Sequence, residues 1–164
     1  MTTIAWDGKT VAADSLSTFD SRIGYVDVIK IRTRGPFVFA LAGRHCLFEA
    51  LMCWVEAGAI AAELPVGCND EAKNDWALLV FERKRARLFT ALCPYATVIE
   101  APFAMGSGGD YAMGAMRGCD QSAREAVRAA MMCDVWSGGS VNAIDLAKYF
   151  ESQDQKFKVT HAAE

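Results

Sequence analysis

The sequence of 164 residues contains no apolar run long enough to cross a membrane as a helix. Near the N-terminus, the apolar residues 4–6 are followed at once by Asp7, and no long apolar segment comes after it. We therefore expect no secretory signal and a cytoplasmic protein.

The residue spacings that are typical of metal sites are also missing. The two histidines, His45 and His161, lie far apart, and neither has a second ligand at helical spacing. None of the six cysteines belongs to a C-x-x-C pair, and most have apolar neighbours in the sequence. We expect no metal site, and we interpret the cysteines as buried free thiols.

An excess of positive charge is missing, because 17 Lys and Arg residues stand against 20 Asp and Glu residues. The composition therefore lacks the basic footprint of a nucleic-acid-binding protein. With 52% hydrophobic residues, the chain can bury one core, but it is too short for two ordinary domains. We expect a single domain over residues 1–164, in which the charged residues 151–164 form a partly mobile C-terminal tail.

Turn signals and apolar patterns predict the elements of this domain. Asp7-Gly8 separates two β-favouring runs and indicates an antiparallel hairpin, and the run FVFALA before Gly43 is typical of a strand covered on both faces. The other expected elements are a weak ribbon of residues 23–28 and 30–32, helices at 44–57, 109–117 and 122–132, and strands at 76–81, 87–90, 96–100 and 141–146. This order predicts an α+β fold with antiparallel sheets between helix layers.

Two threonines follow the initiator methionine directly. Aminopeptidases remove an initiator methionine that precedes a small residue, so the mature chain would begin with Thr2. That residue would then carry a hydroxyl and a free α-amine, whose ordinary pKa of about 7.7–8.0 suits a general base near neutral pH. Thr2 is therefore a candidate nucleophile with its own base, although most Met-Thr starts have no such meaning.

Two charged residues lie within apolar stretches. Asp14 ends a strand that is expected to be buried, and Lys30 lies between Ile29 and Ile31. Because a buried carboxylate needs a cationic partner, we predict that Asp14 and Lys30 form an ion pair. From these residues alone, the pair is equally well interpreted as structural or as a device that activates Thr2.

Two glycine-rich clusters stand near the ends of expected helices. Residues 106–109 (GSGG) open one helix, where backbone N–H groups could bind an oxyanion or a phosphate. A phosphate loop is disfavoured because no lysine follows at Walker spacing. Residues 134–139 (DVWSGG) are consistent with a loop that follows a helix.

In this order, these segments resemble proteasome β-subunits and their bacterial relative HslV, which are N-terminal threonine hydrolases with the Ntn-hydrolase fold. The matching stretches run along nearly the whole chain: TTIAWDGKTVAADS, KI at residues 30–31, FALAG, MGSGGDYAMGAM and DVWSGG. The resemblance implies a four-layer αββα sandwich, a threonine endopeptidase without a cofactor, and stacked homo-oligomeric rings that act on unfolded polypeptides or peptides. A separate ATP-dependent unfoldase would account for any use of ATP, and neither nucleic acid nor a membrane is implied as a partner.

The resemblance also implies roles for individual residues. Thr2 would be the nucleophile, and Asp14 and Lys30 would form the charge pair that activates it. The hydrogen-bond network around the amine would be completed by Ser107, Asp134 and Ser137.

The same resemblance assigns the substrate side of the site. The N–H of Gly43 would donate to the oxyanion, and Leu41 at the base of the primary specificity pocket implies a preference for apolar side chains. Arg44-His45-Cys46 departs from the family, where smaller residues commonly follow this glycine.

A ring also needs apolar contact surface, for which the candidates are Phe48, Met52, Trp54, Met113, Met116, Met131 and Met132, although for any single one of them a place in the ordinary core is the more frequent case. Two alternative functions stay open. One is an amidohydrolase with the same fold that acts on a small amide, and the other is a ring-forming structural protein in which Thr2 remains blocked.

Overall fold

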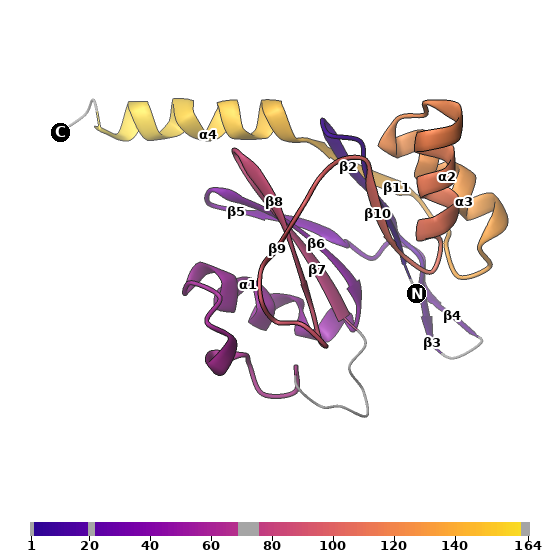
Figure 1. Ribbon diagram of the computed structural model, residues 1–164, viewed down its shortest axis with the longest axis horizontal. Helices are drawn as coiled ribbons and strands as arrows, with labels where there is room; N and C mark the ends of the chain where they lie inside the picture. Colours follow the sequence, from indigo (N-terminus) through magenta and orange to yellow (C-terminus); the bar gives the residue numbers. More distant parts are fainter. Residues whose placement is uncertain (1, 20–21, 69–75, 162–164) are drawn as a thin grey trace.

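The computed structural model describes residues 2–19, 22–68 and 76–161 of the chain. Within these residues, the chain forms two antiparallel sheets, a separate two-stranded ribbon and four α-helices (Figure 1). In spatial order, the first sheet contains β10 (Phe103–Gly106), β1 (Thr3–Trp6), β2 (Thr10–Asp14) and β11 (Val141–Asp145). The second contains β5 (Ile31–Arg34), β6 (Phe37–Gly43), β7 (Trp76–Glu82), β8 (Arg85–Thr90) and β9 (Thr97–Ile99).

The remaining elements flank the two sheets. The ribbon pairs β3 (Ser17–Phe19) with β4 (Arg22–Tyr25). The helices are α1 (Phe48–Glu56), α2 (Gly109–Cys119), α3 (Ala123–Cys133) and α4 (Leu146–His161), and short 3-10 turns occur at His45–Leu47 and Ala61–Glu63.

Three apolar clusters define four layers. Ile4 of β1 and Leu79 of β7 belong to a cluster that fills the space between the two sheets. Ala12 of β2 packs in a second cluster with α2 and α3, and Phe39 of β6 packs in a third cluster with α1. The layers therefore follow the order α2 and α3, first sheet, second sheet, α1, which confirms the predicted αββα sandwich.

Strand β6 shows why the run FVFALA is apolar at every position. Val38, Ala40 and Ala42 contribute to the cluster between the sheets, whereas Phe39 and Leu41 contribute to the cluster under α1. Since successive side chains of a strand point to opposite faces, a strand with a covered layer on each side needs apolar residues throughout.

The structure differs from the sequence analysis at several strands. Residues 23–28 were expected to pair with residues 30–32, but β4 pairs with β3, and β5 pairs with β6 of the second sheet. Strand β10, which pairs with β1 across about a hundred residues of chain, was not predicted at all. Pairings between distant segments leave no local turn signal to identify them.

The C-terminal segment forms α4, a helix that the sequence analysis did not include. In Figure 1, α4 extends outward from the two sheets. Leu146 and Phe150 on its first turns reach the cluster between the sheets, and the hydroxyl of Tyr149 donates a 2.8 Å hydrogen bond to the Gly35 carbonyl. The single domain over residues 1–164 and the mobility of residues 151–164 stay predictions.

Two expectations about side chains need correction. Of the six cysteines, all of which are free, only Cys68 is buried, because the other five lie on outer helix faces and in loops. Of the residues expected at an apolar interface, Phe48, Met52, Trp54 and Met116 pack in the core, whereas Met132 is 88% exposed. No helix in the described residues is long and apolar enough to span a bilayer.

Candidate active site

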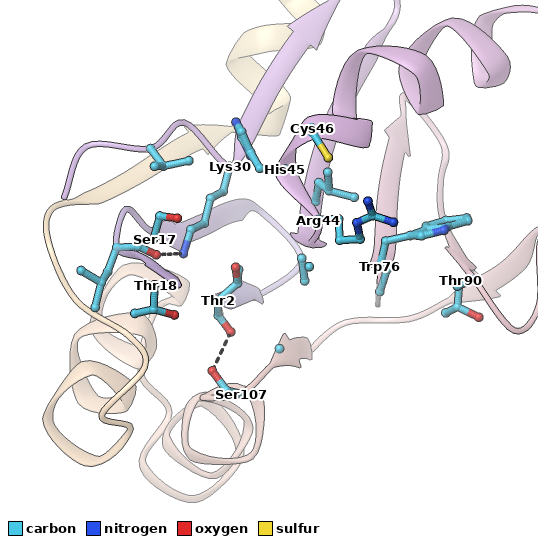
Figure 2. A pocket seen from close by; sticks show the side chains of 18 of the residues that line it. Thr2, Ser17, Thr18, Lys30, Arg44, His45, Cys46, Trp76, Thr90 and Ser107 are labelled. Carbon is cyan, nitrogen blue, oxygen red and sulfur yellow. Dashed lines mark hydrogen bonds between the residues drawn. The ribbon is translucent and has the colours of Figure 1, made fainter. Parts of the chain in front are cut away.

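Thr2 lies just before β1 and is 4% exposed, at a cavity of about 700 Å³. Leu16 after β2, Leu41 and Gly43 on β6, and Ser107 after β10 line the same cavity. Figure 2 shows Thr2 between the Lys30 side chain and Ser107. The first residues of the chain are thus held inside the fold, at a cavity lined by residues from both sheets.

Asp14 and Lys30 form the ion pair that the sequence predicts. The Lys30 ammonium lies 2.8 Å from Oδ1 of Asp14 and also donates to the Leu16 carbonyl at 2.7 Å. The other carboxylate oxygen accepts hydrogen bonds from the N–H groups of Leu16 and Gly138, at 3.2 and 3.0 Å. Because both carboxylate oxygens of Asp14 accept hydrogen bonds, the negative charge is well compensated although Asp14 is completely buried.

Burial changes the acidity of the lysine in this pair. Loss of hydration lowers the pKa of Lys30 below its ordinary value, against the attraction of Asp14 and the weaker attraction of Asp134. Lys30 lies immediately before β5, and its carbonyl accepts a 3.0 Å hydrogen bond from the N–H of Leu41. The sheet therefore holds the lysine at a set position relative to the cavity wall.

Ser107, Asp134 and Ser137 come together from two distant loops. Oδ2 of Asp134 accepts hydrogen bonds from the hydroxyls of Ser107 and Ser137, at 2.7 and 2.6 Å. The Ser107 hydroxyl also lies 3.4 Å from the carbonyl oxygen of Thr2. This cluster joins the loop before α2 and the loop after α3 to the N-terminal residues.

Asp134 is held in its ionised form by these donors. Burial acts to raise its pKa, but hydrogen bonds from Ser137, Ser107 and the Trp136 N–H outweigh that effect, so the pKa lies below its ordinary value. Near neutral pH, Asp134 is an acceptor only. Both serine hydroxyls must therefore donate to it.

Thr3 belongs to the site, and the sequence analysis did not identify it. Its hydroxyl lies 2.6 Å from the hydroxyl of Ser137, and its N–H donates to Oδ1 of Asp14 at 2.8 Å. Because Ser137 uses its one proton on Asp134, Thr3 is the donor in the contact with Ser137. Thr3 links the ion pair to the Asp134 cluster; the only sequence signal was a second threonine in a strand.

The glycines of the cluster GSGG have a structural role that the sequence analysis did not identify. A Cβ atom at Gly106 would lie 1.9 Å from the carbonyl oxygen of Thr2, and one at Gly108 would lie 2.0 Å from the Thr3 hydroxyl. The glycines therefore allow two chain segments to approach closely. Gly106 also has a φ of 92°, which side chains rarely adopt.

Gly43 and Leu41 both line the cavity. Gly43 is half-buried with a φ of 95°, and Leu41 is 2% exposed. All eight residues that the resemblance assigned to the site thus lie around one cavity or in the hydrogen-bond network beside it. Their chemical roles stay predictions.

The charged groups that line the cavity are positive. These groups are Lys30 and Arg44, His45 lies in the same lining, and the described lining contains no Asp or Glu. Burial, followed by the charges of Arg32 and Lys30, lowers the pKa of His45 below its ordinary value. In the part of the chain that the structure describes, no three His, Cys, Asp or Glu side chains gather into a group that could hold a metal ion.

Comparisons with known proteins agree with the geometry at the level of the fold. No protein-family model and no curated protein sequence matches this chain. The structure is similar to eukaryotic HslV from Trypanosoma brucei, with a TM-score of 0.66, 22% identity, and coverage of 87% of this chain and 97% of that one. It is also similar to Thiobacillus denitrificans BPH in complex with epoxomicin, with a TM-score of 0.66, 19% identity, and coverage of 87% and 96%. A second BPH structure gives a TM-score of 0.63 at 20% identity and covers 87% and 95%.

Proposed function

We propose that this chain is a threonine-type peptidase subunit of a self-compartmentalising, proteasome-like ring in the cytoplasm, with Thr2 as nucleophile once Met1 is removed. One observation carries the proposal. Thr2 is buried at the cavity beside the Asp14–Lys30 pair, in a chain whose fold is similar to that of HslV.

The reaction would proceed through an ester on Thr2. The Thr2 hydroxyl oxygen attacks the carbonyl carbon of the scissile peptide bond, and its proton passes to the Thr2 α-amine. The N–H of Gly43 donates to the oxyanion that develops. The C–N bond then breaks, the leaving amine takes the proton from the α-ammonium, and an ester between the substrate acyl group and Thr2 Oγ remains.

Hydrolysis of this ester would restore the enzyme. The α-amine takes a proton from a water molecule, whose oxygen attacks the ester carbonyl. The bond to Thr2 Oγ breaks, the hydroxyl regains its proton, and the acid product leaves. The chain supplies both the base and the nucleophile, so the reaction requires no cofactor.

The neighbouring residues would hold and activate Thr2. The positive charge of Lys30 favours the deprotonated forms of the Thr2 hydroxyl and amine, and Asp14 keeps that charge in place. Ser107, Asp134 and Ser137 hold the N-terminal segment through the contacts with Thr2 and Thr3. A second enzyme of this fold, an amidohydrolase, would use the same residues.

Confinement is the reason to expect a ring. An open site of this kind would attack any unfolded chain, whereas a chamber of stacked homo-oligomeric rings admits only unfolded polypeptides and peptides. An ATP-dependent unfoldase would be a separate protein.

The intact mass of the purified protein, measured with and without epoxomicin, tests the proposal. One of the similar proteins is described in complex with this compound, which makes it a suitable probe of the candidate site. We expect a chain without Met1, a mass increase by one epoxomicin, and cleavage of a fluorogenic peptide with an apolar residue before the leaving group. Thr2→Ala should abolish the last two, and Thr2→Ser should retain labelling.

Other outcomes point to the alternatives. A retained Met1 with no labelling and no cleavage would contradict the peptidase and favour a structural ring protein. Labelling at Thr2 with hydrolysis of small amides, but of no peptide, would favour the amidohydrolase. Size-exclusion chromatography with native mass spectrometry determines the number of subunits in each case.

A further inference from the structure

Arg44 differs from most other arginines near the two sheets because no carboxylate among the described residues forms an ion pair with it. Arg34, Arg83, Arg85 and Arg87 each form an ion pair with Asp or Glu. Among the described residues, none forms an ion pair or a side-chain hydrogen bond with Arg44, which is half-buried in the cavity wall. Half-burying a guanidinium without a counter-ion costs free energy unless a ligand supplies one.

The other basic groups of the cavity are already compensated or neutral. Lys30 is held by Asp14 and by the Leu16 carbonyl. His45 lies 3.4 Å from the Arg32 guanidinium, and its lowered pKa favours the neutral ring at neutral pH. The uncompensated charge of the described cavity wall is therefore the guanidinium of Arg44.

The surroundings of Arg44 are apolar. Leu41, Trp76, Ala77 and Ala91 line the same cavity, and Figure 2 shows Arg44 and Trp76 in the same part of that lining. A charge beside apolar walls interacts with a ligand more strongly than a charge surrounded by water. The planar guanidinium also presents paired N–H donors in the geometry that a carboxylate accepts.

We propose that the cavity selects peptides in which an acidic side chain lies close to an apolar one, with Arg44 binding the carboxylate and the wall around Leu41 and Trp76 receiving the apolar group. This inference rests on the proposed peptidase function. It changes the expectation from Leu41 alone, which was a preference for apolar side chains without a charge. Arg44 acts here as a specificity residue and takes no part in bond breaking.

A set of matched fluorogenic peptides tests the inference. Each peptide is an apolar tripeptide with a fluorogenic leaving group, and Glu, Gln or Lys replaces the residue at each of its positions in turn. In one series, Leu is kept before the leaving group and only the other positions are varied. We expect one position at which kcat/KM for Glu exceeds that for Gln by roughly 10-fold to 100-fold, the range that a hydrogen bond to a charged group supplies. Lys at the same position should be the poorest of the three.

Three variants test whether the preference for Glu over Gln peptides depends on Arg44. Arg44→Gln should remove the difference between Glu and Gln peptides, and Arg44→Glu should reverse the order so that Lys is preferred. Arg117→Gln removes the same charge from an exposed position on α2 that does not line the cavity, so it should leave the preference unchanged.

The two proposals fail in different ways. Cleavage of the all-apolar peptide with equal rates for Glu, Gln and Lys peptides, or a Glu preference that survives in Arg44→Gln, would overturn this inference and leave the peptidase function standing. Absence of cleavage together with absence of epoxomicin labelling would overturn the peptidase function, and this inference with it.

Discussion

The N–H of Thr3 and the ammonium of Lys30 donate to the same oxygen of Asp14, each at 2.8 Å. This carboxylate oxygen therefore holds the N-terminal segment and the buried charge at the same point. A change at Asp14 alters the position of Thr2 and the electrostatic potential around it together. The contacts of Thr3 thus help to hold Thr2 at its position.

Replacement of Asp14 by Asn is expected to destabilise the protein by about 3–5 kcal/mol, because the charge of Lys30 remains buried without its partner. Urea unfolding at pH 7 measures this loss. The double variant Asp14→Asn with Lys30→Met should recover most of the stability, since no charge is then buried, but it should not recover peptidase activity. Equal unfolding midpoints for the wild type and Asp14→Asn would contradict the expected role of the ion pair.

Thr3→Val removes a hydroxyl and keeps the shape of the side chain. The buried contact with Ser137 is lost, so we expect a destabilisation of about 1–3 kcal/mol and a lower kcat, with KM little changed because Thr3 does not line the cavity. Thr3→Ser retains the hydroxyl and should restore kcat. If Thr3→Val and Thr3→Ser have equal kcat values, the hydroxyl has no positioning role.

The layered fold could be predicted from sequence because its strands are short and strongly patterned. The run FVFALA and the hairpin at Asp7-Gly8 indicate their structure locally, and the capping box of Ser122 and Glu125 marks the start of α3. Strand β10 was missed because its partner β1 lies far away in the sequence. Helix α4 was missed although Leu146 and Phe150 have helical spacing, because its charged second half looks like a tail.

The site was predictable only in part for similar reasons. Asp14 and Lys30 stand out because charged residues within apolar runs need partners. Thr3 has no such signal, since a threonine in a strand is ordinary. The close approach of Gly106 to Thr2 depends on two segments that meet only in the folded chain. A charged residue within an apolar stretch can be recognised in the sequence, whereas a close contact between ordinary residues cannot.

Gly106→Ala is expected to displace Thr2, because the added Cβ would lie 1.9 Å from the Thr2 carbonyl oxygen and the φ of 92° disfavours any side chain. Epoxomicin labelling should then fall at least about tenfold in rate, since small displacements of catalytic groups have large effects. Gly114→Ala is the matched control. Nothing lies within 4 Å of a Cβ at this position of α2, so this variant should be stabilised by about 0.5–1 kcal/mol with normal labelling. Normal labelling of Gly106→Ala would contradict the expected close contact.

The Asp134 cluster predicts how stability depends on acid. The pKa of Asp134 is lower in the folded protein than its ordinary value of 3.8, so the unfolded chain binds a proton more readily. The resulting stabilisation is present above the ordinary pKa and is lost as the pH falls through the folded pKa. In Asp134→Asn this contribution is absent, so the variant should be less stable than the wild type at pH 6, and the two should converge as the pH falls below about 4.

Other carboxylates with lowered pKa values, such as Glu125 and Asp145, contribute equally to both proteins. The difference between the two curves of unfolding free energy against pH therefore reports on Asp134 alone, and a difference that stays constant down to pH 2 would show that its charge does not stabilise the cluster.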